Sequence, residues 1–347
     1  MGVTLSPADV RGGEMVLSLG DPGLTALHRV GLAGLWMTLD AFEKQPQLAA
    51  PIRAAGGDWH LEDDQIRVRW SGDSATFFST LVQSSFKLDD HGLVYFPALG
   101  ASGSHPADAV VLQDALLGTF LQHGRTRGAD PSGKPAGSLV AGDLEDPTPL
   151  KFRRMSWYAH MRAKIDVGQA MPLAGWQYPG GAVRHTGLSD KTALFEPANR
   201  YLELLYAPVG AYFFLLKART RATRPAYCVV LPELRDLRSY AHARRSFGGV
   251  RQLTAAGGAE AAFRVLIHLR AQGLLKDLAS VWCRVVEFGV VPWASQQKTR
   301  IRLYDVTPVD TSALDAFELA EQVFPVRQVK LPNGARFWSA PQTPDLV

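Results

Sequence analysis

The stretch LTALHRVGLAGLWMTLDAFEKQ, residues 24 to 45, sets the expected fold. Its apolar and small residues recur at intervals of three and four, which is the spacing of one face of an α-helix. Gly31 and Gly34 lie in this pattern and are small enough to let a neighbouring element pack closely. The strand-like segment EMVLSLG precedes the helix, and a Gly-Asp-Pro-Gly turn separates the two.

Further along the chain, helical and strand-like segments follow in no regular alternation. Two hairpins are expected, in WHLEDDQIRVRW with its turn at Glu62, Asp63 and Asp64, and in KLDDHGLVYFP. A third, RQVKLPNGARFWSA, has Asn-Gly at its turn. The absence of a βαβ rhythm argues against a doubly wound parallel sheet. The pattern predicts an α+β fold of mixed helices and antiparallel hairpins, in one large or two closely packed domains.

Charge is distributed unevenly along the 347 residues. Residues 1 to 150 hold 10 Lys and Arg against 18 Asp and Glu, whereas residues 151 to 251 hold 17 against 6. We therefore expect a net acidic N-terminal α+β part (1–123), a Gly- and Pro-rich loop or boundary (124–150), and a basic part facing nucleic acid (151–347). Concentrated positive charge is typical of a phosphate-binding surface, although it also serves solubility.

Several classes of protein are disfavoured by composition. The longest nearly uninterrupted apolar run, Tyr206 to Leu216, is much shorter than the ~20 residues that cross a bilayer. The N-terminus has no apolar signal-peptide core, and two cysteines, Cys228 and Cys283, make no disulfide framework. We expect a cytoplasmic protein with no membrane partner.

Known catalytic motifs are also lacking. GADPSGKP, residues 128 to 135, follows the phosphate-loop spacing only to Lys134, because Pro135 replaces the Ser or Thr that would hold magnesium. The nine histidines show no metal-ligand spacing. We therefore expect no cofactor, no metal and no enzymatic activity.

Three basic segments stand out in the middle of the chain. KFRRMSWYAHMRAK (151–164) interleaves positive charge with rings and contains no acid, which suits single-stranded nucleic acid. KARTRATRP (217–225) and RSYAHARRSFGGVR (238–251) add further charge. The candidate phosphate-contacting residues in these segments are Arg153, Arg154, Lys217, Arg219, Arg221, Arg244 and Arg245.

Two polar stretches add further candidates. In YPGGAVRHTG (178–187), a Pro-Gly-Gly turn precedes Arg184 and His185, which could contact phosphate or base edges. An ordinary tight turn and a general acid–base role for His185 are alternatives. In VPWASQQKTR (291–300), an apolar run gives way to the candidates Gln296, Gln297, Lys298 and Arg300, with no acid among them. An ordinary loop between two strands is the alternative here.

GDPGLTALHRVGLAGLWMTL (20–39), YPGGAVRHTG and VPWASQQKTR together resemble the Myxan-type large subunit of the type I CRISPR Cascade complex. The similarity runs from near the N-terminus to past residue 300, within the family's N-terminal part. Longer members continue into a helical part resembling the small subunit, so we expect that function to come from a separate polypeptide or to be absent.

The resemblance implies a non-catalytic subunit at the foot of an RNA-guided complex. There it would lie beside the 5′ end of the guide RNA (crRNA), recognise the short motif (PAM) flanking the double-stranded DNA target, and help open the duplex. Implied partners are the Cascade backbone and guide-5′-end subunits, together with a downstream helicase-nuclease or transposition proteins. Two other functions stay open: a repeat-processing ribonuclease using His185, and a scaffold whose basic face docks an acidic protein.

Overall fold

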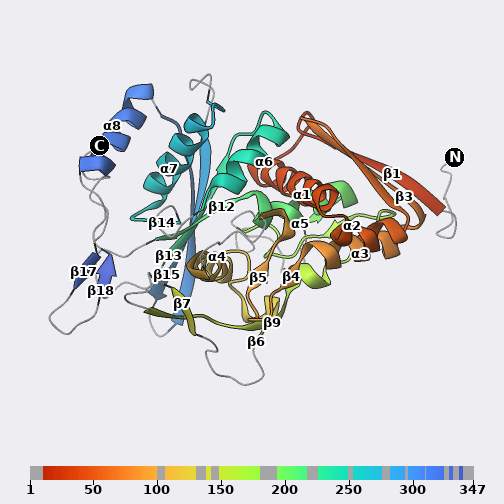
Figure 1. Ribbon diagram of the computed structural model, residues 1–347, viewed down its shortest axis with the longest axis horizontal. Coiled ribbons are helices and arrows are strands. Elements are labelled where there is room, and N and C mark those ends of the chain that lie inside the picture. The colour runs from red at the N-terminus through yellow and green to blue at the C-terminus, as the bar shows by residue number, and fades with distance from the viewer. Residues whose placement is uncertain are drawn as a thin grey trace. The chain divides into compact units, whose positions relative to one another are not determined.

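The structure is a computed structural model (Figure 1), and it describes residues 11–99, 106–129, 138–141, 148–179, 194–216, 226–248, 253–275, 282–293, 296–308, 310–323, 328–330 and 336–338. Helices and mostly antiparallel strands follow in irregular order, which confirms the expected α+β class. The chain divides into unit 1 (Met1–Ala211 with Leu234–Ser246) and unit 2 (Tyr212–Glu233 with Phe247–Val347). The functional division expected at residues 124 to 150 stays a prediction.

Unit 1 is built around two helices in close contact, α1 (Ala26–Lys44) and α5 (Ala198–Gly210). The expected helix at residues 24 to 45 is therefore confirmed. A Cβ atom at Gly31 would lie 1.9 Å from the carbonyl oxygen of Glu203, and one at Gly210 would lie 1.9 Å from that of Val30. Because real Cβ atoms do not approach this closely, glycine at both positions permits the backbone contact between the helices.

A three-stranded antiparallel sheet covers another part of the unit 1 core, with strands in the order β1 (Arg11–Ser18), β3 (Gln65–Asp73), β2 (Gly57–Leu61). The β2–β3 hairpin confirms the expected one, with the acidic residues 62 to 64 between its strands. Helices α2 (Pro46–Ala54) and α3 (Ser74–Ser85) pack nearby, and Trp70 of β3 stacks on Phe77 of α3 with ring centroids 5.8 Å apart.

Shorter elements complete unit 1: β4 (Lys87–Leu88), β5 (Val94–Tyr95), η1 (Pro97–Leu99), α4 (Pro106–Gly118), η2 (Gly124–Thr126), β6 (Arg127–Ala129), β7 (Ser138–Ala141), β8 (Thr148–Lys151), β9 (Met155–Tyr158), η3 (Ala159–Arg162), β10 (Met171–Pro172), β11 (Phe195–Glu196) and α6 (Leu237–Ser246). The pairing of β4 with β5 confirms the second expected hairpin. Helix α6 returns from later in the chain, and its Tyr240 hydroxyl donates to the Gly210 carbonyl oxygen at 2.7 Å.

Unit 2 contains a five-stranded sheet in the order β14 (Thr254–Ala255), β12 (Tyr212–Leu216), β13 (Ala226–Pro232), β15 (Cys283–Trp293), β16 (Gln296–Val306). Only the β12–β14 pair of this sheet is parallel. Helix α7 (Gly258–Ala271) packs on β13 and β15, and α8 (Thr311–Val323) packs on α7 (Figure 1). Glu287 joins helix to sheet by accepting from the Gly258 amide at 2.8 Å and the Tyr304 hydroxyl at 2.7 Å.

The C-terminal part of unit 2 contains the antiparallel pair β17 (Gln328–Lys330) and β18 (Arg336–Trp338). This pair confirms the strands of the third expected hairpin. Its Asn-Gly turn lies outside the described residues.

The long β15–β16 hairpin extends beyond the sheet that carries it (Figure 1). Strand β13 pairs with β15 only as far as Phe288, whereas β15 and β16 stay paired out to Trp293 and Gln296. Among the described strands, residues 289–293 therefore pair only with residues 296–300. We call these two strand segments the hairpin arm.

Candidate nucleic-acid interface

Two of the three stretches that carry the family resemblance meet in unit 1. His28 of α1 belongs to the first stretch and Tyr178 to the second, and their ring centroids are 6.1 Å apart. Tyr178 stands two residues before residues 180 to 193, which lie outside the described residues and include the rest of the second stretch. The short β10–β11 pair closes the base of that segment, since Met171 pairs with Glu196. The fold thus brings α1 to the base of the segment that contains Arg184 and His185.

Five ionisable residues, Asp21, His28, Glu196, Arg200 and Glu203, form what we call the α1–α5 cluster. Arg200 holds it together, because one guanidinium nitrogen lies 3.0 and 3.1 Å from the two carboxylate oxygens of Glu203. The same nitrogen lies 3.6 Å from Oδ2 of Asp21, and the other donates to the Pro22 carbonyl oxygen at 3.1 Å. Nε2 of His28 lies 3.7 Å from Oε1 of Glu196.

Burial sets the charge states of the α1–α5 cluster. Burial lowers the pKa of His28 to about 4, and the Arg200 guanidinium acts in the same direction. Burial also raises the pKa of Glu203 to about 8, against the opposing effect of Arg200. A neutral imidazole and a completely buried carboxyl do not present reactive groups to a ligand in solvent. The cluster is suited to fixing the base of the adjoining segment rather than to catalysis.

Only some of the aromatic side chains in the basic segment 151 to 164 are exposed at the surface. Arg153 is exposed, and Arg154 donates to the Asp90 carbonyl oxygen at 3.1 Å. Tyr158 and His160, which the sequence suggested as stacking rings, are 1% exposed each and belong to the core. The expectation of several surface rings is wrong here, because the core takes these two and leaves Trp157 partly exposed.

The environment of His160 is aromatic. Its ring packs against Trp176 with centroids 4.5 Å apart, against Phe86 at 5.2 Å and against Tyr158 at 5.8 Å. Neither ring nitrogen has a hydrogen-bond partner among the described residues. Burial accordingly lowers the pKa of His160 to about 3, so the imidazole is neutral near pH 7.

Gln296, Gln297, Lys298 and Arg300 lie in strand β16, within the hairpin arm. The alternative of an ordinary inter-strand loop is therefore wrong for these residues, which pair with Trp293, Pro292, Val291 and Gly289 of β15. Their backbones are held by the strand ladder, in an arm that the described strands flank on neither side. The arm carries two glutamines and two cations on one strand.

The arginines of α6 serve the fold of unit 1. Arg244 is 5% exposed and its Nε donates to the Ala211 carbonyl oxygen at 3.0 Å. Arg245 donates to the carbonyl oxygens of Ala98 at 3.0 Å and Met37 at 2.9 Å, and pairs with Asp40 at 2.7 Å. In this conformation both guanidinium groups are engaged by the protein itself.

Several candidates cannot be placed. Arg184, His185, Lys217, Arg219 and Arg221 lie outside the described residues. Most of GADPSGKP also lies outside them.

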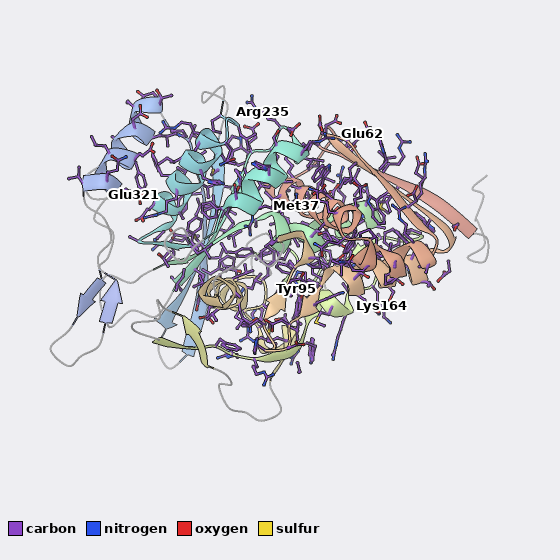
Figure 2. The ribbon with its side chains drawn as sticks, viewed as in Figure 1. Met37, Glu62, Tyr95, Lys164, Arg235 and Glu321 are labelled. Atoms are coloured by element: carbon purple, nitrogen blue, oxygen red, sulfur yellow. The ribbon has the colours of Figure 1, made fainter. Side chains whose placement is uncertain are left out.

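Two exposed residues were not selected as candidates from the sequence, and one of them, Arg162, lies against the Trp157 ring. Arg162 and Lys164 are exposed, and Lys164 is labelled in Figure 2 at the surface of unit 1. The signal for both was the acid-free segment 151 to 164 itself. Spacing alone did not indicate which of its cations the fold leaves in solvent.

A polar hollow of about 500 Å³ lies in unit 1 and is lined by Trp36, Asp40, Glu43, Lys44, His60, Leu61, Arg238, His242 and Arg245. Its charges are largely matched within the protein. Asp40 pairs with Lys44 at 2.8 Å as well as with Arg245, and Arg238 pairs with Asp63 at 2.9 Å. We therefore do not assign the hollow to the interface.

Among the described residues, no three His, Cys, Asp or Glu side chains gather as metal ligands would. No helix in this part of the chain has the length and apolar character that crossing a membrane requires. Cys228 and Cys283 are free and buried, and burial raises the pKa of both thiols.

Comparison with known proteins identifies the family. Residues 16–205 match the family model described as the DevT N-terminal domain, which is more than half of the chain. The chain therefore belongs to the DevT N-terminal domain family.

A curated relative extends the comparison to most of the chain. The CRISPR-associated protein Cas8a1/Csx13 of Myxococcus xanthus (strain DK1622) is 28% identical over 332 residues, which is 90% of this chain and 56% of the relative. The chain thus spans about half the length of the curated relative it matches. The family match and this relative confirm the resemblance to a Cas8-type large subunit of a CRISPR system.

Proposed function

We propose that this chain acts as the large-subunit polypeptide of a type I CRISPR Cascade complex in the cytoplasm. In this role it binds the 5′ region of the guide RNA, contacts the double-stranded DNA target, recognises its flanking motif and engages downstream effectors. The protein reads backbone shape and a few base edges, while base pairing between guide and target reads the sequence. Polar, basic and non-catalytic surfaces suit this role.

One observation carries the proposal. The two N-terminal stretches of the family resemblance, far apart in sequence, meet where His28 contacts Tyr178 beside the buried α1–α5 cluster. His28 of the helix pair α1–α5 thereby contacts Tyr178 and lies beside Glu196, which flank residues 180 to 193, in a chain similar to a CRISPR-associated protein. A rigid scaffold that presents a Gly-rich polar segment is a common arrangement for binding phosphates.

The hairpin arm supports the second half of the proposal. Its four polar candidates lie on a strand that extends beyond the sheet, so they are held in register. Lys298 and Arg300 have the chemistry to contact phosphates, and Gln296 and Gln297 have the chemistry to read a base edge. We propose that the arm approaches the flanking region of the target.

Purification from the native host tests the assembly. Tagged chain should bring down a ribonucleoprotein that contains a short guide RNA and the other subunits. Recovery of the chain without RNA or partners would contradict the proposal. Cleavage of labelled repeat RNA by the purified chain without metal would instead favour the ribonuclease.

A flanking-motif library, with affinities measured at two salt concentrations, tests the hairpin arm. Removing Lys298 or Arg300 should lower the slope of log affinity against log salt by about one unit, equally across target sequences. Removing Gln296 or Gln297 should relax preference at one base position, at a cost of about 1–3 kcal/mol. Lys44→Ala is the control, because its ammonium pairs with Asp40. Four variants that bind like the parent would reduce the arm to a connector.

A further inference from the structure

Trp157 forms part of a stack at the surface of unit 1. It lies in β9 directly opposite Gly128 of β6. A Cβ atom at Gly128 would lie 2.3 Å from Cδ1 and Nε1 of Trp157, so the indole packs on the glycine backbone. The guanidinium carbon of Arg162 lies 3.8 Å from the Trp157 ring centroid. Gly128, Trp157 and Arg162 therefore support one another, and we call them the Trp157 stack.

The guanidinium of this stack differs from two others on tryptophan rings. Arg53 lies 4.0 Å from the centroid of Trp59 and pairs with Asp58. The guanidinium carbon of Arg284 lies 5.2 Å from the ring centroid of Trp282, and Arg284 pairs with Asp305 at 2.8 Å.

Arg162 has no such carboxylate. It is exposed, and it makes no ion pair with any residue that the structure describes. Its hydrogen-bond donors and one face of its planar group are thus free of an acidic partner. A planar cation held on an aromatic ring keeps its orientation, which reduces the entropy lost when a ligand binds.

A further cation follows the Trp157 stack in the chain. Lys164, two residues after Arg162, is exposed and makes no ion pair within the described part of the chain, whereas the charge of Arg153 interacts with the carboxyl of Asp114. Between Asp146 and Asp166 the sequence contains no acidic residue. Lys164 is two residues from Arg162, so their Cα atoms are at most about 7 Å apart at the ~3.3–3.6 Å that an extended residue spans.

We propose that the Trp157 stack is a base-stacking platform for single-stranded nucleic acid, with Arg162 against a base and Lys164 on a neighbouring phosphate. Guanidinium planes and aromatic rings stack on any base, while cations that lack an acidic partner attract the backbone. The inference deepens the proposed function and rests on it for the identity of the strand, which is a guide RNA or an opened DNA strand.

Photo-crosslinking and anisotropy on the purified full-length chain test the platform. The probes are ~10-nucleotide single strands that contain 5-iodouracil, made as RNA and as DNA of one sequence. Crosslinks should map to the peptide containing residues 155 to 162. R162A should weaken binding about five- to tenfold. Stronger binding of one probe would indicate which strand the platform holds.

A charge-preserving variant separates stacking from charge. R162K should lose nearly as much affinity as R162A, because an ammonium has no plane to stack on a base. R53Q is the matched control, since Arg53 also lies on a tryptophan but has a carboxylate partner, and it should bind like the parent. If R162K binds the probes as tightly as the parent does, the proposal that Arg162 stacks on a base is refuted.

Other outcomes also decide the inference. If polyglutamate peptide displaces the probes at equal concentration of charge, the surface is a protein-docking face and the platform is refuted. If R162A binds probes like the parent while the native complex still carries guide RNA, this inference fails and the proposed function stands. If the native chain carries no RNA while R162A and R162K both lose probe binding, the platform stands and the proposed function fails.

Discussion

Replacing His160 with Phe should make unit 1 more resistant to acid. Burial lowers the pKa of this imidazole to about 3 in the folded chain, against an ordinary value of about 6.5. Between these two values the unfolded state binds the proton and the folded state does not. Because protonation of His160 favours the unfolded state, the folded state loses stability as the pH falls from about 6.5 towards 3. Phenylalanine cannot titrate and fits an environment that is already aromatic.

The size of this stability loss follows from the difference between the pKa of His160 in the folded state and its pKa in the unfolded state. From pH 6.5 to pH 5 the parent loses about 1.4 kcal/mol for each pH unit through this residue, or about 2 kcal/mol in all. For a unit of this size, 1 kcal/mol corresponds to about 2–4 °C in melting temperature. The melting temperature of H160F relative to the parent should thus rise by about 4–8 °C between pH 7 and pH 5.

Thermal melts of parent and H160F at pH 7 and pH 5 measure this difference directly. His28, whose pKa burial also lowers, is present in both proteins, so its effect cancels in the comparison. His60→Gln is the control, because its side chain is 71% exposed, and its offset from the parent should not widen. An H160F offset that is the same at both pH values would refute the reasoning.

Four further outcomes are expected. Gly34→Ala should destabilise unit 1 by about 1–3 kcal/mol, because the new Cβ would lie 2.3 Å from the Tyr206 carbonyl oxygen, whereas Gly124→Ala, which meets open space, should melt like the parent. Glu203→Gln should remove a stability loss of about 2 kcal/mol on going from pH 6 to pH 8, since the raised pKa makes the folded parent lose stability as the pH rises through about 8; denaturation at both pH values measures it. Neither the parent nor His185→Ala should cut repeat RNA in a gel assay. Cleavage by the parent that is lost in His185→Ala would contradict this. Lys298→Ala should lower the salt slope of target binding by about one unit, and an unchanged slope in the titration would remove this residue from the interface.

Local patterns predicted helix α1 and the short hairpins well. Helix α1 (Ala26–Lys44) lies inside the expected range because its apolar face repeats over five turns, and Gly31 sits where its neighbour's backbone passes. The hairpin β2–β3 (Gly57–Leu61 and Gln65–Asp73) was visible because one face of each strand is buried. Elements that bury one face in a regular way leave this mark in the sequence.

The hairpin arm left no such mark. This two-stranded segment continues past the described strands that neighbour it, and its β16 residues, QQKTR, show no alternation of apolar and polar types. Residues 296 to 300 therefore looked like a loop. The backbone pairing that makes them a strand comes from β15 alone.

The prediction that the rings of segment 151 to 164 lie at the surface failed for a different reason. Sequence shows that rings and cations alternate there, but not which side of the chain meets the core. Tyr158 and His160 point inward, where Phe86 and Trp176 cover His160 from other elements of unit 1. The partners of Arg245 are further away in sequence, since Ala98 and Met37 are 147 and 208 residues from it. Such tertiary contacts decide which cations remain available for a ligand.

The discontinuous course of the chain through unit 1 bears on its synthesis. Residues up to Ala211 leave the ribosome before helix α6 exists, and the 35 residues from 212 to 246 take about 2–7 s at ~5–20 residues per second. Until then the carbonyl oxygens of Gly210 and Ala211 lack the donors that Tyr240 and Arg244 later supply. The nascent N-terminal part must wait in an incomplete state, open to chaperones, while the first strands of the second unit are made.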